Sequence, residues 1–412
     1  MAYLFSKKHP IVGFDSSSAR IADLNAGFDA TQGVSSDEIH EMLQGGTVLT
    51  DDLDQLRGCD FFIITVPTPV DDDDNPDFSC LVSASRKVGQ VMQKGAIVIY
   101  ASTVYPGATE EVCVPVLEET SGMTCNKDFA VGYSPERVNP GDAVHTPANI
   151  VKVISASTPE TLSIVFDVYE QVFGKDGIYA ASSIKVAEAC KVLENTQRDV
   201  NIALMNEAAK VFDAMGISTH EVIDAMNTKW NALGFRPGLV GGHCISVDPY
   251  YLIRKAKSLG IDANLMSEAR RINNAMPEFV VQHTLSKLRN ETFPNMKLRV
   301  LLLGVTFKEN CPDVRNTKVK DIYRQLIAHQ IDTVVFDPVA DPKLVEQVMD
   351  MKIVTAQSEM SDSKFNAILL CVSHDQFRDF DFKAHLVDGG FVYDIKNMIP
   401  TNKKQNIKLI KL

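Results

Sequence analysis

The sequence predicts an α/β protein in which two doubly wound domains are joined by a helical middle region. Three observations predict this fold. Short apolar runs alternate with helical patterns through about the first 180 residues, the same alternation returns near residue 291, and one long helical stretch lies between them. Alternating strands and amphipathic helices are typical of parallel sheets covered by helices on both faces. We therefore expect domains at residues 1–180, 181–290 and 291–412.

Five nearly continuous apolar runs predict the strands of the first domain, because parallel strands are buried on both faces. The runs lie at residues 11–14, 61–66, 96–101, 129–133 and 150–154. Helical patterns separate them at residues 77–92, 109–119 and 159–172. Together these segments predict a wound sheet of parallel strands.

The run at residues 11–14 follows a short helical pattern and ends in Asp15. A strand that follows a helix and ends in an acidic residue is typical of the second strand of a dinucleotide-binding unit, whose glycines precede that residue by about 20 positions. That position lies before Met1. We therefore expect the first strand of the N-terminal sheet and its phosphate loop to be absent from this chain, which predicts a truncated or mis-assigned start.

The middle of the chain is helical and the end returns to alternation. No Gly or Pro interrupts the stretch from residue 184 before Gly216, which predicts a connecting helix of unusual length that runs toward residue 226. A second helical group covers residues 249–289. The last domain then has four apolar strands, at residues 298–307, 332–338, 364–372 and 389–395, and one helix at residues 318–328.

Composition and charge narrow the classes of function. A net charge of −12 argues against a general surface for nucleic acid or anionic membranes. There is no run of about 18 apolar residues and no signal peptide, so we expect no membrane association. The eight cysteines show no CxxC and no paired Cys/His spacing, which argues against a metal site and a disulfide framework. The sequence thus predicts a cytoplasmic enzyme with free thiols.

The segment FRPGLVGGHCISVDPYYL (residues 235–252) is the sharpest chemical signal. Glycines, including Gly241 and Gly242, let the backbone approach a ligand closely, and Cys244 follows them. A cysteine between a Gly-rich loop and a helix can become nucleophilic through nearby backbone N–H groups, and Asp248 can order a water beside it. A lone cysteine is more often small core filler, so that alternative stays open.

A second candidate pair lies in the long predicted helix. Lys191 and Asn195 are four residues apart, so their side chains share one helical face. An ammonium and a carboxamide on one face can both donate hydrogen bonds to an oxyanion. A polar stripe on an exposed helix is the alternative. His243 is not a convincing base for Cys244, because adjacent residues rarely point toward each other.

Polar and Pro-rich segments follow four of the predicted N-terminal strands, at the edge where wound sheets bind ligands. Asp15 ends one strand. The others end in TVPTP (residues 65–69), ASTVYPG (101–107) and YSPERVNPGD (133–142), the last of which supplies Glu136 and Arg137. Each segment alone is typical of a plain loop, but four at corresponding strand ends indicate a ligand site.

These segments together resemble one family, the nucleotide-sugar 6-dehydrogenases, which oxidise the C6 alcohol of a UDP-sugar to a carboxylate with NAD. The resemblance covers essentially the whole chain and rests on VPTP, STVYPG, YSPERVNPGD, KVLENTQRDVN, GLVGGHCISVDPYYL and GVTFKENCPDVRNTK, in that order. It is strongest to the branch that acts on UDP-N-acetylhexosamines, in particular the UDP-N-acetylglucosamine 6-dehydrogenases of Vi-type capsule and O-antigen synthesis. It implies Rossmann-like domains, NAD as cofactor, a UDP-N-acetylhexosamine substrate and a homodimer through the long helix.

The resemblance also assigns roles by position. It implies catalytic roles for Cys244, Lys191, Asn195, Asp248, Thr103 and Glu136. It implies contacts to the cofactor for Asp15, Arg20, Pro67, Thr68, Thr103, Glu136 and Arg315. It implies contacts to the substrate for Arg137, Lys191, Asn195, Arg236, Gly241, Gly242, Arg270 and Lys308.

Within that assignment Cys244 is the nucleophile, Lys191 and Asn195 stabilise the alkoxide and oxyanion, and Asp248 orders water or acts as a base. Thr103 and Glu136 hold the catalytic water and line the nicotinamide side. UDP-glucose enzymes carry a second Glu four residues after Glu136, where this chain has Pro140, so a role that needs this second carboxylate is not expected here.

Two other functions remain open at this point. Single-step 3-hydroxyacid dehydrogenases share the architecture and the Lys/Asn pair, but they lack the Gly-rich Cys loop and a second α/β domain. An incomplete protein that binds a UDP-sugar without holding NAD is the non-catalytic alternative. The sequence also leaves open the sugar, since UDP-glucose and the UDP-linked N-acetylglucosamine, N-acetylmannosamine and N-acetylgalactosamine differ at positions that a few loop side chains can distinguish.

Overall fold

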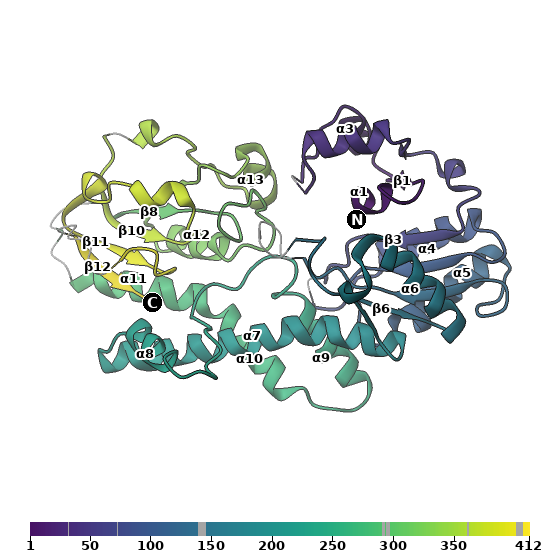
Figure 1. Ribbon diagram of the computed structural model, residues 1–412. Coiled ribbons are helices and arrows are strands. Elements are labelled where there is room, and N and C mark those ends of the chain that lie inside the picture. Colours follow the sequence, from purple (N-terminus) through teal and green to yellow (C-terminus); the bar gives the residue numbers. More distant parts are fainter. Residues whose placement is uncertain are drawn as a thin grey trace. The chain divides into compact units, whose positions relative to one another are not determined.

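The computed structural model (Figure 1) describes residues 1–31, 33–71, 73–138, 146–290, 293, 297–360, 362–400 and 407–412. The chain folds as two compact units. Unit 1 consists of Met1–Glu194 and Tyr250–Leu259, and unit 2 consists of Asn195–Pro249 and Gly260–Leu412. Each unit contains a five-stranded sheet covered by helices, which confirms the predicted α/β class.

The main sheet of unit 1 has the strand order β3-β4-β5-β6-β7. Its strands are β3 (Phe61–Ile64), β4 (Ile97–Tyr100), β5 (Ala130–Tyr133), β6 (Lys152–Ala156) and β7 (Ile178–Ala180). One face packs against α4 (Ser79–Val91) and α5 (Val114–Ser121), which continues from a π-helical turn at Thr109–Cys113. The other face packs against α1 (Ala2–Ser6) and α6 (Pro159–Phe173). The sheet is therefore covered on both sides, as its apolar strands predict.

One strand of this sheet runs opposite to the prediction. β6 pairs antiparallel with β5, whereas β3, β4 and β5 are parallel to one another. The predicted parallel direction for residues 150–154 is therefore wrong. A parallel neighbour requires a crossover connection that is usually a helix. The connection after β5 contains prolines at positions 135, 140 and 147, which disfavour a helix, and the chain returns directly beside β5.

A second, two-stranded sheet in unit 1 is separate from the main sheet. β1 (Val12–Phe14) pairs in parallel with β2 (Val48–Thr50), and α2 (Ser18–Asn25) and α3 (Ser36–Gln44) connect them. Sequence analysis predicts β1 but not β2, α2 or α3. Among the described strands, none pairs with the second edge of β1 or of β3.

The sheet of unit 2 is entirely parallel and has the order β12-β11-β10-β8-β9. Its strands are β8 (Arg299–Leu303), β9 (Asp332–Phe336), β10 (Phe365–Leu370), β11 (Leu386–Asp394) and β12 (Lys408–Lys411). The helices α11 (Met276–Asn290), α12 (Val319–Ala328) and α13 (Pro342–Met349) share one apolar core with the sheet. This arrangement confirms the four predicted strands and the predicted helix of the last domain.

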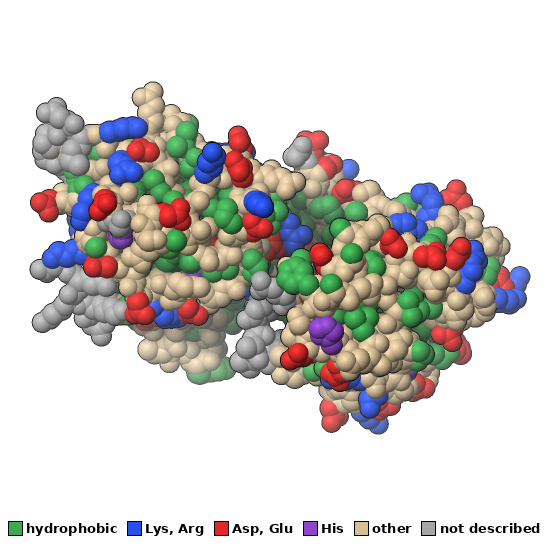
Figure 2. Space-filling view, turned by 90° about the horizontal axis from the view of Figure 1, so that it is seen from above, with side chains coloured by type: hydrophobic (Ala, Val, Ile, Leu, Met, Phe, Trp, Pro, Cys, Tyr) green, Lys and Arg blue, Asp and Glu red, His purple; other side chains and the backbone are tan. Residues whose placement is uncertain are grey.

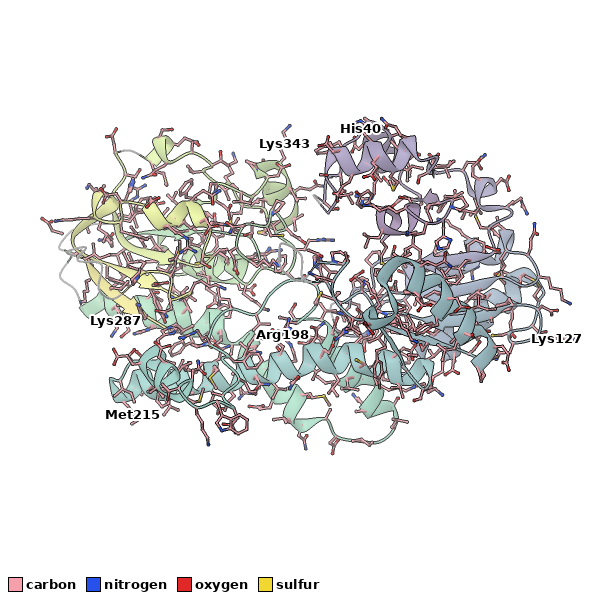
Figure 3. All side chains as sticks on the ribbon, in the orientation of Figure 1. His40, Lys127, Arg198, Met215, Lys287 and Lys343 are labelled. Carbon is pink, nitrogen blue, oxygen red and sulfur yellow. The ribbon has the colours of Figure 1, made fainter. Side chains whose placement is uncertain are left out.

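The predicted long central helix is present, but it ends earlier than the predicted run toward residue 226, which contains a second helix. α7 (Ile184–Met215) contains 32 residues and ends before Gly216, whose φ of +73° lies in the left-handed region that favours glycine. Figure 3 labels Arg198 and Met215 on this helix. The remaining helices are α8 (Thr219–Met226), α9 (Asp248–Ser258) and α10 (Asn264–Asn274). Across the described ranges, no helix combines the length and apolarity needed to cross a membrane.

Charged side chains of both signs are interspersed over the face drawn in Figure 2. That face shows no continuous basic surface, which agrees with the net charge of −12.

Gly132 in β5 has no room for a side chain. A Cβ atom there would overlap the carbonyl oxygen of Ser155 on β6 and lie 2.6 Å from Cδ1 of Ile99 on β4. We expect Gly132→Ala to lower the free energy of unfolding of unit 1 by about 1–3 kcal/mol, because overpacking forces neighbours apart. Gly177→Ala is the matched control, since its Cβ would meet only Phe173, at 3.4 Å. Equal melting temperatures for the two variants would contradict this prediction.

Candidate active site

Two predicted cofactor residues follow β1: Asp15 directly after the strand and Arg20 on α2. Arg20 also contacts a third charged residue, Asp29. The Asp15 carboxylate accepts a hydrogen bond from the Ser17 N–H at 2.8 Å. Nε of Arg20 lies 3.7 Å from Asp15, and its terminal nitrogen lies 3.4 Å from the buried carboxylate of Asp29. Arg20 is therefore held between two carboxylates, while the Asp15 side chain keeps 41% of its surface exposed.

The loops after β3 and β4 are hydrogen-bonded to each other. The Thr68 hydroxyl donates to the carbonyl of Thr103 at 2.7 Å, and the Ser102 hydroxyl donates to the carbonyl of Val66 at 2.6 Å. The hydroxyl of Tyr251 on α9 donates to the carbonyl of Thr68 at 2.7 Å. Pro67 lies exposed within this segment. The structure thus brings together Pro67, Thr68 and Thr103, as predicted strand-end neighbours.

Glu136, after β5, is fixed as an anion by a buried lysine. Nζ of Lys152 lies 3.1 Å from both carboxylate oxygens, and the Lys152 side chain is only 1% exposed. The N–H groups of Arg137 and Val138 donate to the same carboxylate at 2.8 and 2.9 Å. Burial tends to raise the pKa of Glu136, but Lys152 and these donors outweigh it and hold the pKa below its ordinary value. The carboxylate is therefore built to accept hydrogen bonds.

Arg137 is bound by the first part of α7. Its guanidinium makes a two-pronged ion pair with Glu194, with Nε at 3.1 Å, and also donates to the Val151 carbonyl at 2.9 Å. Lys191, one turn earlier on α7, is 7% exposed. Fork-shaped Arg–carboxylate pairs fix geometry as well as charge. The predicted residues Arg137 and Lys191 thus both lie in unit 1, and Arg137 pairs with a carboxylate, Glu194, that sequence analysis did not name.

In unit 2 the predicted catalytic residues Asn195, Cys244 and Asp248 are joined by two short hydrogen bonds. Nδ2 of Asn195 donates to Oδ2 of Asp248 at 2.5 Å, and both side chains are buried. The Asp248 N–H donates to the Cys244 carbonyl at 2.8 Å, so Cys244 lies one helical turn before Asp248 at the start of α9. Cys244 is exposed, and none of the eight cysteines, all of them in described positions, forms a disulfide.

The Gly-rich loop before Cys244 packs directly on the loop after β8. A Cβ on Gly241 would lie 2.7 Å from the Asn316 carbonyl oxygen, and one on Gly242 would lie 2.7 Å from the ring of Phe307. Gly242 also has a φ of +83°, which other residues rarely adopt. The amide of Asn316 donates to the Gly242 carbonyl at 3.3 Å. These glycines therefore permit a close contact inside unit 2.

A buried carboxamide holds the start of the same loop. Asn206 on α7 accepts from the Gly238 N–H at 2.8 Å and donates to its carbonyl at 3.0 Å. Asn206 also donates to Asn273 at 2.8 Å, and Asn273 donates to Asp199 at 2.7 Å. The predicted substrate residue Arg270 is 3% exposed and pairs with this Asp199 at 2.6 Å. Arg270 is therefore part of the buried network that supports the Gly-rich loop.

Two more predicted residues of unit 2, Arg315 and Lys308, lie in the loop that packs on the Gly-rich loop. The Arg315 guanidinium pairs with Asp313 at 2.9 Å, and Asp313 lies 3.0 Å from Nε2 of His243. Burial and Arg315 lower the pKa of His243, against the raising effect of Asp313. Lys308 is half-buried near the ring of Phe307. His243 thus contacts the loop after β8.

Arg236 lies at the opening of the Gly-rich segment, away from those charges. Its guanidinium pairs with Asp224 on α8 and lies 3.3 Å from Nδ1 of His220.

A small pocket opens where the loops of unit 2 meet. Its lining comes from the Gly-rich loop, from the ends of β8, β10 and β11, and from the start of α12: Leu239, Gly241, Thr306, Phe307, Thr317, Lys318, Val319, Cys371, Val372 and Lys396. Two lysines and a helix N-terminus favour an anion there.

The predicted residues divide between the units. Unit 1 holds Asp15, Arg20, Pro67, Thr68, Thr103, Glu136, Arg137 and Lys191, and unit 2 holds Asn195, Arg236, Gly241, Gly242, Cys244, Asp248, Arg270, Lys308 and Arg315. Pro140 lies outside the described residues. In the part of the chain that the structure describes, no cluster of three or more metal-ligating side chains is present.

Comparison with known proteins identifies the family. Family profiles match residues 1–173, 185–275 and 301–401, described as the NAD binding, central and UDP binding domains of the UDP-glucose/GDP-mannose dehydrogenase family. A UDP-N-acetyl-D-glucosamine 6-dehydrogenase from Pseudomonas aeruginosa is 47% identical over 98% of this chain and 95% of the relative. The chain belongs to the UDP-glucose/GDP-mannose dehydrogenase family. A UDP-N-acetyl-D-glucosamine 6-dehydrogenase from Salmonella typhi is 43% identical over 98% of the chain and 94% of the relative.

Solved structures of relatives agree with this membership. A UDP-D-ManNAc dehydrogenase from Pyrococcus horikoshii superposes with a TM-score of 0.87 at 29% identity, covering 100% of this chain and 95% of that one. The UDP-N-acetyl-mannosamine dehydrogenase Cap5O from Staphylococcus aureus gives 0.84 at 26% identity, covering 100% and 94%. The predicted family, fold class, NAD cofactor and oxidoreductase activity are confirmed.

The strand ends of this dehydrogenase fit NAD. Asp15 presents an exposed carboxylate at the end of β1, which is the acceptor that an adenosine ribose requires. The loops after β3, β4 and β5 lie at one end of the parallel strands and carry Thr68, Thr103 and the anionic Glu136. NAD, when bound, accepts the hydride that the substrate loses.

Sequence analysis of the dehydrogenase missed the partners of its site residues. Lys152 is detectable in principle, because it is a charged residue within an otherwise apolar strand, IVKVIS. Glu194 and Asp313 have polar sequence neighbours and give no local signal, and Asn206 is a single amide in a helical pattern. Each is recognised only by its contact. Asp313 pairs with Arg315, two residues away in sequence, and Glu194 pairs with Arg137, 57 residues away.

The buried ion pair between Lys152 and Glu136 predicts a pH-dependent loss of stability. We expect Lys152→Met to lower the free energy of unfolding at pH 7 by about 1–2 kcal/mol, a value that allows for solvent screening of the half-exposed carboxylate. Because the folded-state pKa of Glu136 is lowered, its contribution is present above the unfolded value of about 4.3 and is lost as pH falls through the folded value. The difference between variant and wild type therefore shrinks in acid.

Urea unfolding at pH 7 and near pH 3.5 measures this difference, and Lys152→Arg is the control that keeps the cation. The prediction is wrong if Lys152→Met loses as much stability in acid as at neutral pH.

Proposed function

We propose that the chain oxidises the C6 alcohol of UDP-N-acetylglucosamine to the carboxylate, for capsule or O-antigen polysaccharide synthesis, with Cys244 as a covalent nucleophile. The observation that carries this proposal is the placement of exposed Cys244 one turn before Asp248, whose carboxylate is hydrogen-bonded to Asn195. The names of the relatives from P. aeruginosa and S. typhi support the sugar.

The thiol accounts for a four-electron oxidation in one site. Loss of the hydroxyl proton and of a hydride, which passes to NAD, converts the alcohol into an aldehyde. The Cys244 sulfur adds to its carbon while the thiol proton is transferred to the carbonyl oxygen, which gives a thiohemiacetal. Loss of the hydroxyl proton of the thiohemiacetal and of a second hydride, to a second NAD, gives a thioester. Water then adds to the thioester carbonyl, the carbon–sulfur bond breaks, and the acid leaves as the thiol is restored. The aldehyde is thus never released between the two steps.

Lys191 and Asn195 stabilise the anions that form on the way. The alkoxide and the tetrahedral intermediates carry negative charge on oxygen, and fixed donors in a poorly solvated pocket stabilise such charge by several kcal/mol. Asn195 is oriented for this role because one of its amide hydrogens is committed to Asp248. The Asp248 carboxylate is a hydrogen-bond acceptor beside Asn195, which suits it to orient the attacking water.

The other predicted residues bind the two ligands. We assign Asp15, Arg20, Pro67, Thr68, Thr103, Glu136 and Arg315 to NAD, with Thr103 and Glu136 also holding water. We assign Arg137, Arg236, Gly241, Gly242, Arg270 and Lys308 to the UDP-sugar. Residues 1–180, 181–290 and 291–412 then serve as the NAD-binding, catalytic and UDP-sugar-binding domains.

The direct test is NADH formation with UDP-N-acetylglucosamine. We expect two equivalents of NADH per sugar, with lower rates for the N-acetylmannosamine and N-acetylgalactosamine epimers and for UDP-glucose in competition assays. Cys244→Ala is expected to reduce acid formation by at least about 10³-fold, whereas Cys80→Ala, at another exposed cysteine, leaves it unchanged. One NADH per sugar, or binding of the sugar without NADH, would contradict the four-electron reaction.

We also propose that the dehydrogenase is a homodimer through α7. Leu204, Val211 and Met215 are 57%, 51% and 64% exposed. Their spacings of seven and four residues place them on one face of the helix. A row of large apolar side chains at heptad-like spacing is typical of a helix that packs on a second helix, and a second copy supplies an identical face.

A charge in this row tests the dimer. Leu204→Asp is expected to shift the protein toward monomer, by at least about tenfold in the dissociation constant, because the charge must be desolvated in the contact. Leu344→Asp, at a 38% exposed position on α13, is the control. Sedimentation equilibrium measures both, and a wild-type protein that stays monomeric at micromolar concentration excludes the dimer.

A further inference from the structure

The sheet of unit 2 has a topological switch point beside β8. β9 and β10 lie on opposite sides of β8, so the connections leave in opposite directions and open a crevice at the carboxyl ends of the strands. The loop after β8 carries Thr306, Phe307 and Lys308, and two of these residues line the pocket described above. The position of this loop therefore determines where Lys308 can meet a ligand.

His374, after β10, is completely buried beneath that loop. Its Nδ1 accepts a hydrogen bond from the backbone N–H of Asn310 at 2.9 Å. Nδ1 therefore carries no proton, and in the neutral ring the proton sits on Nε2. Nε2 lies 3.2 Å from both Asp337 Oδ2 and Thr306 Oγ1. The structure thus fixes one tautomer, with the acceptor facing the loop and the donor facing a carboxylate.

Asp337, at the end of β9, is equally buried and holds the His374 donor in place. Its two oxygens also accept N–H groups from both sides, including Val305 at 2.6 Å and Ala340 at 2.9 Å. Burial alone raises the pKa of this carboxyl, but His374 and these donors lower it below its ordinary value. Because Asp337 is an anion, the nearer nitrogen of His374, Nε2, must present a hydrogen to it rather than a lone pair.

Both ends of the loop depend on this arrangement. At the first end, the Thr306 hydroxyl donates to the Lys308 carbonyl at 2.8 Å, so its oxygen is left to accept from His374. At the second end, Asn310 has a φ of +55°, and its side chain exchanges hydrogen bonds with Asp375, the residue after His374. Lys308 lies between two anchors that converge on one histidine.

We propose that His374 is a positioning residue for nucleotide binding, because its Nε2–H tautomer, fixed by Asp337, holds the loop from Thr306 to Asn310 and thereby Lys308. This inference rests on the proposed binding of a UDP-sugar by unit 2. The ring itself is buried and acts only through the loop.

Titration with UDP tests the role without NAD or turnover. His374→Gln keeps an amide near the Nε2 position but removes the acceptor for Asn310, whereas His374→Asn places an amide oxygen near the Nδ1 position. We expect UDP affinity to fall about tenfold or more in His374→Gln and by a smaller factor in His374→Asn, which keeps the acceptor for Asn310 but loses the donor to Thr306 and Asp337. If His374 only fills space, His374→Gln should lose no more UDP affinity than His374→Asn, since Gln is closer to His in volume.

His385→Gln is the matched control. His385 is also buried in unit 2, where it stacks on Phe380 and lies near the Ser363 carbonyl, away from the loop. Its variant should bind UDP like the wild type, and melting temperatures of all three variants report their stability separately.

The outcomes separate two failures. Normal UDP binding by His374→Gln overturns the positioning role alone. No UDP binding by the wild-type chain overturns the proposed function and this inference with it. Nitrogen chemical shifts of ¹⁵N-labelled histidine supply a second readout: a protonated Nε2 and a bare Nδ1 at neutral pH support the tautomer, and a protonated Nδ1 overturns it.

Discussion

The loops that carry the predicted site residues are held by buried polar side chains that hydrogen-bond to their backbones. Glu188 accepts N–H groups of the segment after β4, Asn206 clamps Gly238, and Asp337 accepts the N–H of Val305. A buried polar group left without a partner costs about 1–3 kcal/mol. A loop can therefore change its conformation only if such a group is exposed to water or left without a hydrogen-bond partner. The geometry of the site is thus tied to the stability of each unit.

Buried charge follows the same logic. The Lys152–Glu136 and Arg270–Asp199 pairs contribute little net stability relative to apolar packing, because both charges must be desolvated. Removing either partner of the Arg270–Asp199 pair, or removing Glu136, is strongly unfavourable, since the other charge then stays buried alone. These pairs therefore select one arrangement of the surrounding backbone over its alternatives. Glu136 is in this way kept as an acceptor, and Arg270 keeps its own charge compensated within unit 2.

Sequence pattern predicts the elements of this dehydrogenase better than their relationships. The apolar runs mark β3, β4, β5 and the strands β8 to β11 of unit 2 because burial on both faces leaves a local signature, whereas β12 is not predicted. The direction of β6 is not local: it depends on how the chain returns from β5. Motifs likewise mark Cys244 and Glu136, but not Asn206, whose contacts to Gly238 and Asn273 are 32 and 67 residues away in sequence.

The glycines before Cys244 show that a motif can have a structural cause besides the predicted one. As a pattern, Gly241 and Gly242 indicate a backbone that a ligand approaches closely. In the folded chain the space beside them is taken by the Asn316 carbonyl and the Phe307 ring, and Gly242 needs a positive φ besides. A side chain at either position would separate the Gly-rich loop from the loop that carries Lys308. The glycines therefore act first within the protein, by letting the loop that carries Cys244 and the loop that carries Lys308 pack as one surface of unit 2.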